Sequence, residues 1–188
     1  MYYANKYPEE VSAMICLDES KPNQFKDENP NFSISQTLSF MFEKTGNFLG
    51  FYRLKNYFQK NFVRELLEFT FRDNDTSFYD KDLLDLISKD VIWHICSIAK
   101  ANAIEMTYKN VKELFDMKYN KNLPVLSILG SEMFKLKEIN WLKLHQDVIS
   151  NPEIQKIKIV KGWHYIHHSQ FKTIADLTKK FLADTNID

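Results

Sequence analysis

Residues 123–129 read LPVLSIL, and this largely apolar run decides the fold class. A second run of strand length, SAMICL, occupies residues 12–17. Runs of this kind are typical of strands that are covered on both faces, as in a parallel sheet. We expect a third strand at residues 156–161, where isoleucine and valine are spaced by lysine.

Helical patterns flank the three expected strands. A first helix is expected at residues 1–7 and is ended by Pro8. Apolar side chains at helical spacing predict two further helices, at residues 139–149 and 171–181, with His145 on the polar side of the former. The alternation of strand and helix predicts the α/β class, with a short parallel sheet of about three strands.

The middle of the chain follows a different pattern. The polar stretch ESKPNQFKDENPNFS, residues 19–33, predicts a linker, and strongly aromatic helical patterns follow it. We therefore expect an α/β core formed by residues 1–20 and 121–188, interrupted by an all-helical insertion at 21–120.

Composition excludes several classes of protein. The chain of 188 residues has 25 basic and 25 acidic side chains and no basic run, which argues against a nucleic-acid partner. Its hydrophobic content of 44% excludes a disordered chain. No apolar run approaches the roughly 20 residues of a membrane span. Cys16 and Cys96 lie in apolar runs, which is typical of reduced core thiols in a cytoplasmic protein.

The four glycines exclude the commonest phosphate-binding loops. They stand at Gly46, Gly50, Gly130 and Gly162, and neither GxGxxG nor GxxxxGK[ST] can be spelled with them. The sequence therefore implies no nucleotide cofactor held by such a loop.

Three segments resemble the C-terminal part of the α/β-hydrolase superfamily. YYANKYPEEVSAMICLDESKP, residues 2–22, resembles the end of the helix after the nucleophile elbow, followed by the sixth strand. LPVLSILGSEM, residues 123–133, resembles the seventh strand and its turn. IQKIKIVKGWHYIHHSQFKTIADLTKKFL, residues 154–182, resembles the eighth strand, the catalytic-histidine loop and the last helix.

The resemblance implies an esterase- or lipase-like serine hydrolase, with residues 21–120 as its helical lid. The substrate would be a small apolar ester or amide, and no metal or organic cofactor is implied. However, the family's GxSxG nucleophile elbow, its oxyanion-hole loop and its first five strands are missing from the sequence. We therefore expect Met1 to be an internal methionine of a longer protein, and the chain to be inactive alone and prone to self-association along the open edge of the 12–17 strand.

The resemblance makes His164 the candidate general base, since it follows the third expected strand and Gly162. The triad acid has two candidates. Asp18 follows the first strand, where some members of the family carry their acid. Glu132 lies one residue before the family's usual position, which here is Met133.

Two aromatic residues, Trp163 and Tyr165, flank the candidate base and are expected to line the substrate pocket. His164, His167 and His168 have a spacing that also occurs in metal sites, but no further ligand lies nearby in the sequence, so no metal site is assigned. The main alternative function is a non-catalytic binding or assembly module built on the same segment.

Overall fold

The computed structural model describes residues 1–26, 110–136 and 140–187, together with isolated positions between 38 and 106. The chain divides into two compact units. One comprises Met1–Lys26, Asp73–Asp75 and Leu114–Asp188, and the other comprises Asp27–Arg72 and Thr76–Glu113. The sheet and the site described below belong to the first unit. The predicted helical insertion lies almost entirely outside the described residues.

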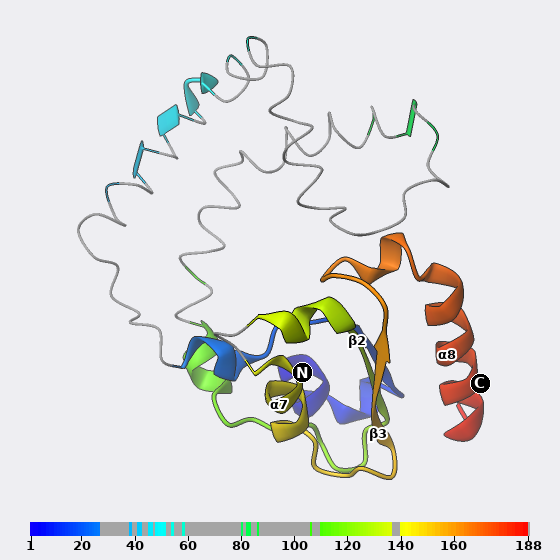
Figure 1. The fold of residues 1–188 in the computed structure, drawn as a ribbon. Coiled ribbons are helices and arrows are strands. Elements are labelled where there is room, and N and C mark those ends of the chain that lie inside the picture. Colours follow the sequence, from blue (N-terminus) through cyan, green and yellow to red (C-terminus); the bar gives the residue numbers. More distant parts are fainter. Residues whose placement is uncertain are drawn as a thin grey trace. The chain divides into compact units, whose positions relative to one another are not determined.

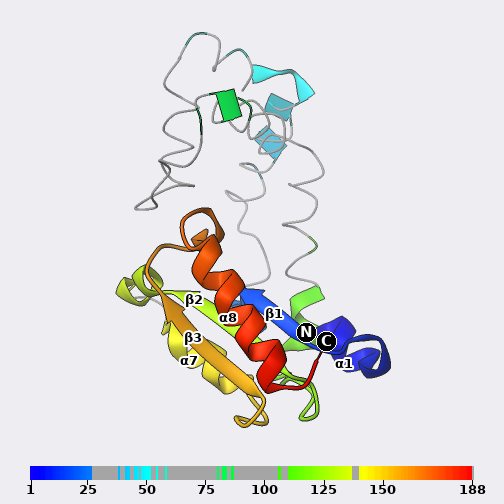
Figure 2. The same cartoon turned by 90° about the vertical axis from the view of Figure 1, so that its right-hand side faces the viewer.

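Three parallel strands form one sheet, as expected for an α/β protein. They are β1 (Met14–Leu17), β2 (Val125–Gly130) and β3 (Gln155–Val160), and β2 lies between the other two (Figure 2). Each strand lies within two residues of its predicted position. The strand β2 begins after Pro124, whose missing N–H cannot join the ladder.

Helices cover both faces of the sheet. On one face lie α1 (Tyr2–Lys6) and α7 (Trp141–Asp147), and on the other lies α8 (Phe171–Asp184) (Figures 1 and 2). Short 3₁₀ helices connect these elements: η1 (Pro8–Glu10), η2 (Pro22–Phe25), η3 (Lys112–Leu114), η4 (Ser131–Lys135) and η5 (Ile166–His168).

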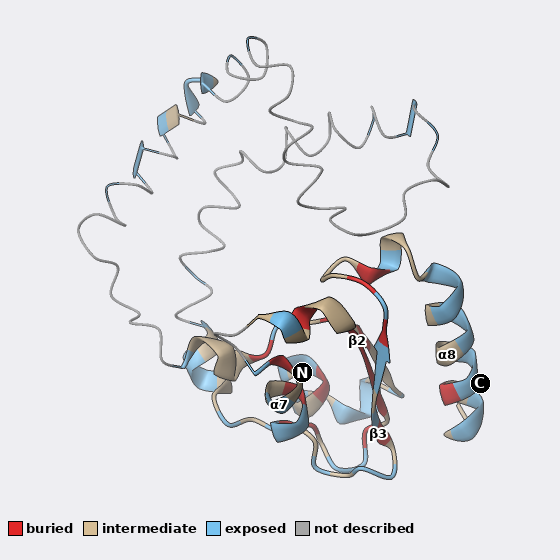
Figure 3. Cartoon of the chain, in the orientation of Figure 1, coloured by how far each residue is buried: buried red, intermediate tan, exposed pale blue. Residues whose placement is uncertain are grey.

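The central strand β2 is buried along its whole length (Figure 3). Its side chains alternate between two cores because successive residues of a strand point to opposite faces. Val125 packs on the side of α1, with Ala4 and Val148, whereas Leu126 and Ile128 pack on the side of α8. This two-sided burial is the physical reason why the run is apolar except at Ser127. No helix within the described part of the chain is long and apolar enough to cross a membrane.

A candidate acid–base site

Three residues meet at the carboxyl-terminal edge of the sheet. Asp18 directly follows β1, Gly130 is the last residue of β2, and His164 lies in the loop after β3. Strands that run in parallel end at the same edge, which is where open α/β sheets carry their functional groups. The site is therefore assembled from three segments that are far apart in the sequence.

The first of these residues, Asp18, is completely buried and has a left-handed backbone, with a φ of 46°. Aspartate and asparagine adopt this conformation more readily than most side chains. The N–H of Asp18 donates to the carbonyl of Ile128 at 2.8 Å, which continues the β1–β2 ladder by one residue. The backbone of Asp18 is therefore fixed by the sheet itself.

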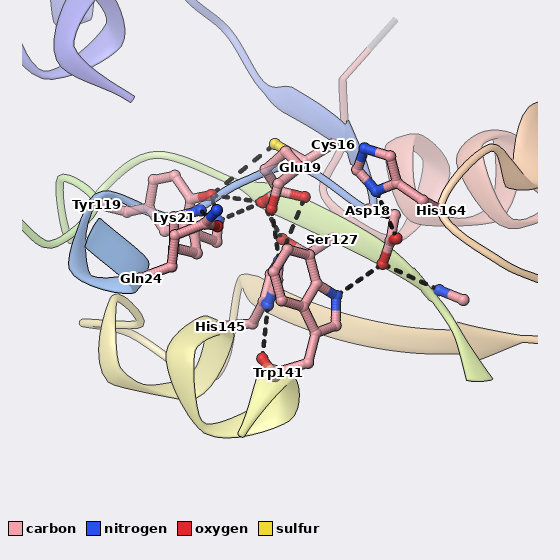
Figure 4. A network of polar contacts seen from close by, with 11 residues as sticks. Cys16, Asp18, Glu19, Lys21, Gln24, Tyr119, Ser127, Trp141, His145 and His164 are labelled. Atoms are coloured by element: carbon pink, nitrogen blue, oxygen red, sulfur yellow. Dashed lines mark hydrogen bonds and ion pairs between the residues drawn. The ribbon is translucent and has the colours of Figure 1, made fainter. Parts of the chain in front are cut away.

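The Asp18 carboxylate accepts N–H groups on both oxygens (Figure 4). Oδ1 accepts from the backbone N–H of Gly130 at 3.2 Å and from Nε1 of Trp141 at 2.8 Å. Oδ2 lies 2.9 Å from Nδ1 of His164. An ionised carboxylate can only accept, so Nδ1 of His164 carries the proton in this pair.

The second ring nitrogen of His164, Nε2, lies on the side of the ring away from Asp18 (Figure 4). The His164 side chain is 41% exposed, whereas that of Asp18 is 0% exposed. A buried acid thus holds the tautomer and orientation of a part-exposed imidazole whose other nitrogen lies away from that acid. This arrangement suits a general base.

Of the two candidate acids, the structure brings Asp18, and not Glu132, to His164. The Glu132 carboxylate forms an ion pair with Lys135. Glu132 contributes to the loop that carries His164 only through its backbone N–H, which donates to the carbonyl of Gly162 at 3.1 Å.

The two predicted pocket residues lie beside His164 in its loop, and both are partly buried. The Tyr165 ring meets the His164 ring edge-on at 5.1 Å between centroids. Trp141, which the sequence did not single out, approaches His164 in the same manner at 6.5 Å.

A second polar cluster, which the sequence did not predict, lies next to Asp18. Glu19 Oε1 accepts from Tyr119 OH and Ser127 Oγ, each at 3.1 Å, and pairs with the ammonium of Lys21. Lys21 is only 2% exposed and also contacts Tyr119 OH at 2.5 Å. Burial alone would raise the pKa of Glu19, but the nearby imidazole of His145, 3.7 Å away, and the charge of Lys21 outweigh it and lower the pKa to about 2.

Two expectations about this cluster are wrong. His145 was expected on the polar side of its helix but is 1% exposed, because its ring nitrogens reach the carbonyls of Trp141 at 2.9 Å and Glu19 at 3.0 Å. Lys21 was expected in a polar linker but is buried, because Glu19 and Tyr119 satisfy its ammonium group.

The two other histidines of the described residues, His167 and His168, lie against each other. The rings of His167 and His168 lie 4.2 Å apart. Burial and the neighbouring charge of His167 lower the pKa of His168 to about 4. Within the described ranges, no group of three His, Cys, Asp or Glu side chains is placed to hold a metal ion.

Comparison of the chain with protein families, with curated proteins and with solved structures finds no match. The Asp18–His164 pair is therefore the feature from which a function can be argued.

Proposed function

We propose that the chain carries the acid and the base of an α/β-hydrolase of the esterase or lipase type, with Asp18 as the acid and His164 as the base. The observation that carries this proposal is the 2.9 Å contact between a fully buried carboxylate and a part-exposed imidazole, at the carboxyl-terminal edge of a parallel sheet. The chain order, acid before histidine, is that of the α/β-hydrolases.

The proposed chemistry is acyl transfer. Nε2 of His164 takes the proton of a serine hydroxyl as that oxygen attacks the substrate carbonyl, and then gives the proton to the leaving group. Asp18 holds the Nδ1 proton and stabilises the imidazolium that forms. A small, fairly apolar ester or amide would be the substrate, and Trp163 and Tyr165 would form part of its pocket. The chemistry requires no metal or organic cofactor.

The nucleophile of this proposal is not within the 188 residues. Gly46 and Gly50 have the spacing of a GxSxG motif, but Phe48 occupies its centre. The serine and the oxyanion hole would therefore come from a polypeptide segment outside this sequence. Residues 21–120 would form the lid, and the absence of a disulfide pattern in the sequence favours the cytoplasm.

The decisive experiment sequences the transcript across the codon for Met1 and expresses the longest in-frame product. We expect an in-frame GxSxG segment, and labelling of its serine by a fluorophosphonate probe. His164→Ala should abolish the labelling, and His167→Ala, which changes an exposed ring, should leave it intact. A transcript without such a segment, or labelling that does not depend on His164, contradicts the proposal and favours a non-catalytic binding module.

A further inference from the structure

We propose that Trp141 is a positioning residue for the Asp18–His164 pair, and that His145 holds Trp141 in place. The indole N–H would fix one oxygen of Asp18 so that only the other oxygen is presented to His164. The catalytic consequence of this inference rests on the proposed function, whereas its structural consequence does not.

The first step is that the two carboxylate oxygens of Asp18 bind different groups. Oδ1 accepts from Gly130 N and from Trp141 Nε1, which uses both lone-pair sites of a carboxylate oxygen. The side chain is fully buried, so no bulk water competes for these sites. With Oδ1 held by two donors from different directions, Oδ2 is the oxygen left for Nδ1 of His164.

The second step is the placement of Trp141 itself. Trp141 is 3% exposed and is the first residue of α7, directly after the N-cap Asn140. The Asn140 side chain accepts from the backbone N–H of Lys143 at 3.1 Å, which secures the first turn of the helix. The indole therefore projects from a capped helix start toward Asp18.

The third step connects Trp141 to the charged cluster. Nδ1 of His145 lies 2.9 Å from the carbonyl of Trp141, and Nε2 lies 3.0 Å from the carbonyl of Glu19. Carbonyl oxygens only accept, so a ring nitrogen satisfies either contact only as a donor. The Glu19 carboxylate, which is paired with Lys21, lies 3.7 Å from Nε2 of His145.

Together these contacts bind two consecutive residues, Asp18 and Glu19, to the helix α7. Glu19 is the neighbour of Asp18 in the chain, and His145 is on the same helix as Trp141. His145 binds the Glu19 backbone while Trp141 binds the Asp18 side chain. The acid is thereby fixed against α7 at two consecutive residues.

The test is Trp141→Phe, which keeps an aromatic ring and removes the N–H. We expect the fraction of His164 in the Nδ1–H tautomer, measured by ¹⁵N NMR, to fall relative to the wild type. In the longer, fluorophosphonate-reactive product, kcat should fall about 10- to 100-fold with little change in KM, as for the loss of one hydrogen bond to a charged group. The matched control is Val148→Ala, which loosens the same face of the sheet without touching Asp18.

An unchanged His164 tautomer in Trp141→Phe, or an equal change in Val148→Ala, overturns the proposal. If Trp141→Phe does not fold, the indole N–H of Trp141 is followed in the wild type. If this N–H exchanges slowly with solvent in the wild type and fast in Asp18→Ala, the proposal is supported. If it exchanges fast in the wild type, the proposal is overturned. If Trp141→Phe changes the His164 tautomer but no fluorophosphonate labelling is found, only the proposed hydrolase function is rejected. If labelling is found but the tautomer does not change in Trp141→Phe, only the positioning role of Trp141 is rejected.

Discussion

A Cβ atom on Gly130 would lie 2.5 Å from the carbonyl oxygen of Gly162 and 2.9 Å from that of Trp163. The end of β2 therefore touches the loop that carries His164, backbone against backbone. Gly162 has a φ of 138°, a backbone conformation that residues other than glycine rarely adopt. This contact sets how closely His164 approaches Asp18, which also binds the N–H of Gly130.

We predict that Gly130→Ala separates His164 from Asp18. The added methyl group would meet backbone atoms that have no freedom to rotate away, so the loop must shift. The free energy of unfolding should fall by about 1–3 kcal/mol, as for other overpacked sites, in a urea melt. The ¹⁵N shifts of the His164 ring should lose the signature of the Nδ1–H tautomer. Ser131→Ala, one residue later, is the control and should change neither quantity appreciably.

Asp18→Asn should invert the tautomer of His164. Asparagine tolerates the left-handed backbone of residue 18, so the fold should survive. Its Oδ1 can still accept from Gly130 and Trp141, which turns the NH₂ group toward His164. Nδ1 of His164 must then accept, and the proton moves to Nε2. In a hydrolase of this kind, such a change costs about 10⁴-fold in kcat.

Glu132→Gln is the matched variant for that experiment, because the Glu132 side chain pairs with Lys135 and not with His164. It should leave the tautomer and the activity near the wild-type values. A larger effect from Glu132→Gln than from Asp18→Asn would reverse the assignment of the acid.

The Glu19 cluster predicts a specific dependence of stability on pH. The pKa of Glu19 is lowered from its ordinary value of 4.5 to about 2, so its ionised form stabilises the fold. That contribution is complete above about pH 4.5 and is lost as the pH falls toward 2. Glu19→Gln should cost about 3–5 kcal/mol at pH 7, because it leaves the ammonium group of Lys21 buried without its counter-charge.

The pH dependence of stability distinguishes the loss of the Glu19 charge from a loss of packing. Urea melts between pH 5 and pH 2 should show a smaller fall in stability for Glu19→Gln than for the wild type. If the free energy of unfolding falls equally with pH in the two proteins, Glu19 does not titrate as its contacts imply.

The buried thiol of Cys16 should be unreactive in the folded chain. Burial, followed by the charge of Glu19, raises the pKa of this thiol to about 11, so little thiolate exists at neutral pH. In a Cys96→Ser background, iodoacetamide at pH 7.5 should modify Cys16 about 100-fold more slowly in buffer than in urea. Comparable rates in the two solvents would mean that β1 opens readily.

The open edge of β1 predicts self-association. Within the described residues β1 pairs only with β2, whereas the outer strand β3 carries Lys156 and Lys158, charges that discourage edge-to-edge pairing. We expect size-exclusion light scattering to show concentration-dependent oligomers of the chain. Ser12→Lys, beside the open edge, should reduce them.

The same charge placed on α8 by Thr173→Lys should not reduce the oligomers, because Thr173 is exposed and belongs to a helix, which has no open strand edge. A monomer at all concentrations, with one steep cooperative urea transition, would contradict this prediction.

The sheet was predictable from the sequence because its central strand is apolar toward both faces. Leu126 and Ile128 pack in one core and Val125 packs in the other, and Ser127, the one polar residue of the run, is buried with its hydroxyl bound to Glu19. The loop position of His164 was predictable for a similar local reason, since it follows a strand and Gly162. The structure of the predicted helical insertion lies outside the described residues, so that prediction stands untested.

The sequence left two candidates for the partner of His164, Asp18 and Glu132, and could not choose between them. Asp18 and Gly130 are 112 residues apart, and their contact depends on the register between β1 and β2. Lys21 and His145 were misassigned for the same reason. A charged residue between polar neighbours is normally exposed, and only contacts with distant segments offset the free-energy cost of burying it.

The order of strands in the sheet has a consequence for folding kinetics. The segment from β2 through α7 to β3 is continuous in sequence, whereas pairing of β1 with β2 closes a loop of about one hundred residues, which is entropically more costly. We therefore expect β2 and β3 to associate first and β1 to dock afterwards. The contact between Asp18 and His164, which are 146 residues apart, would then appear only in the last step. A nascent or partly folded chain would present His164 without its acid, and recovery of the paired imidazole during refolding would report completion of the fold.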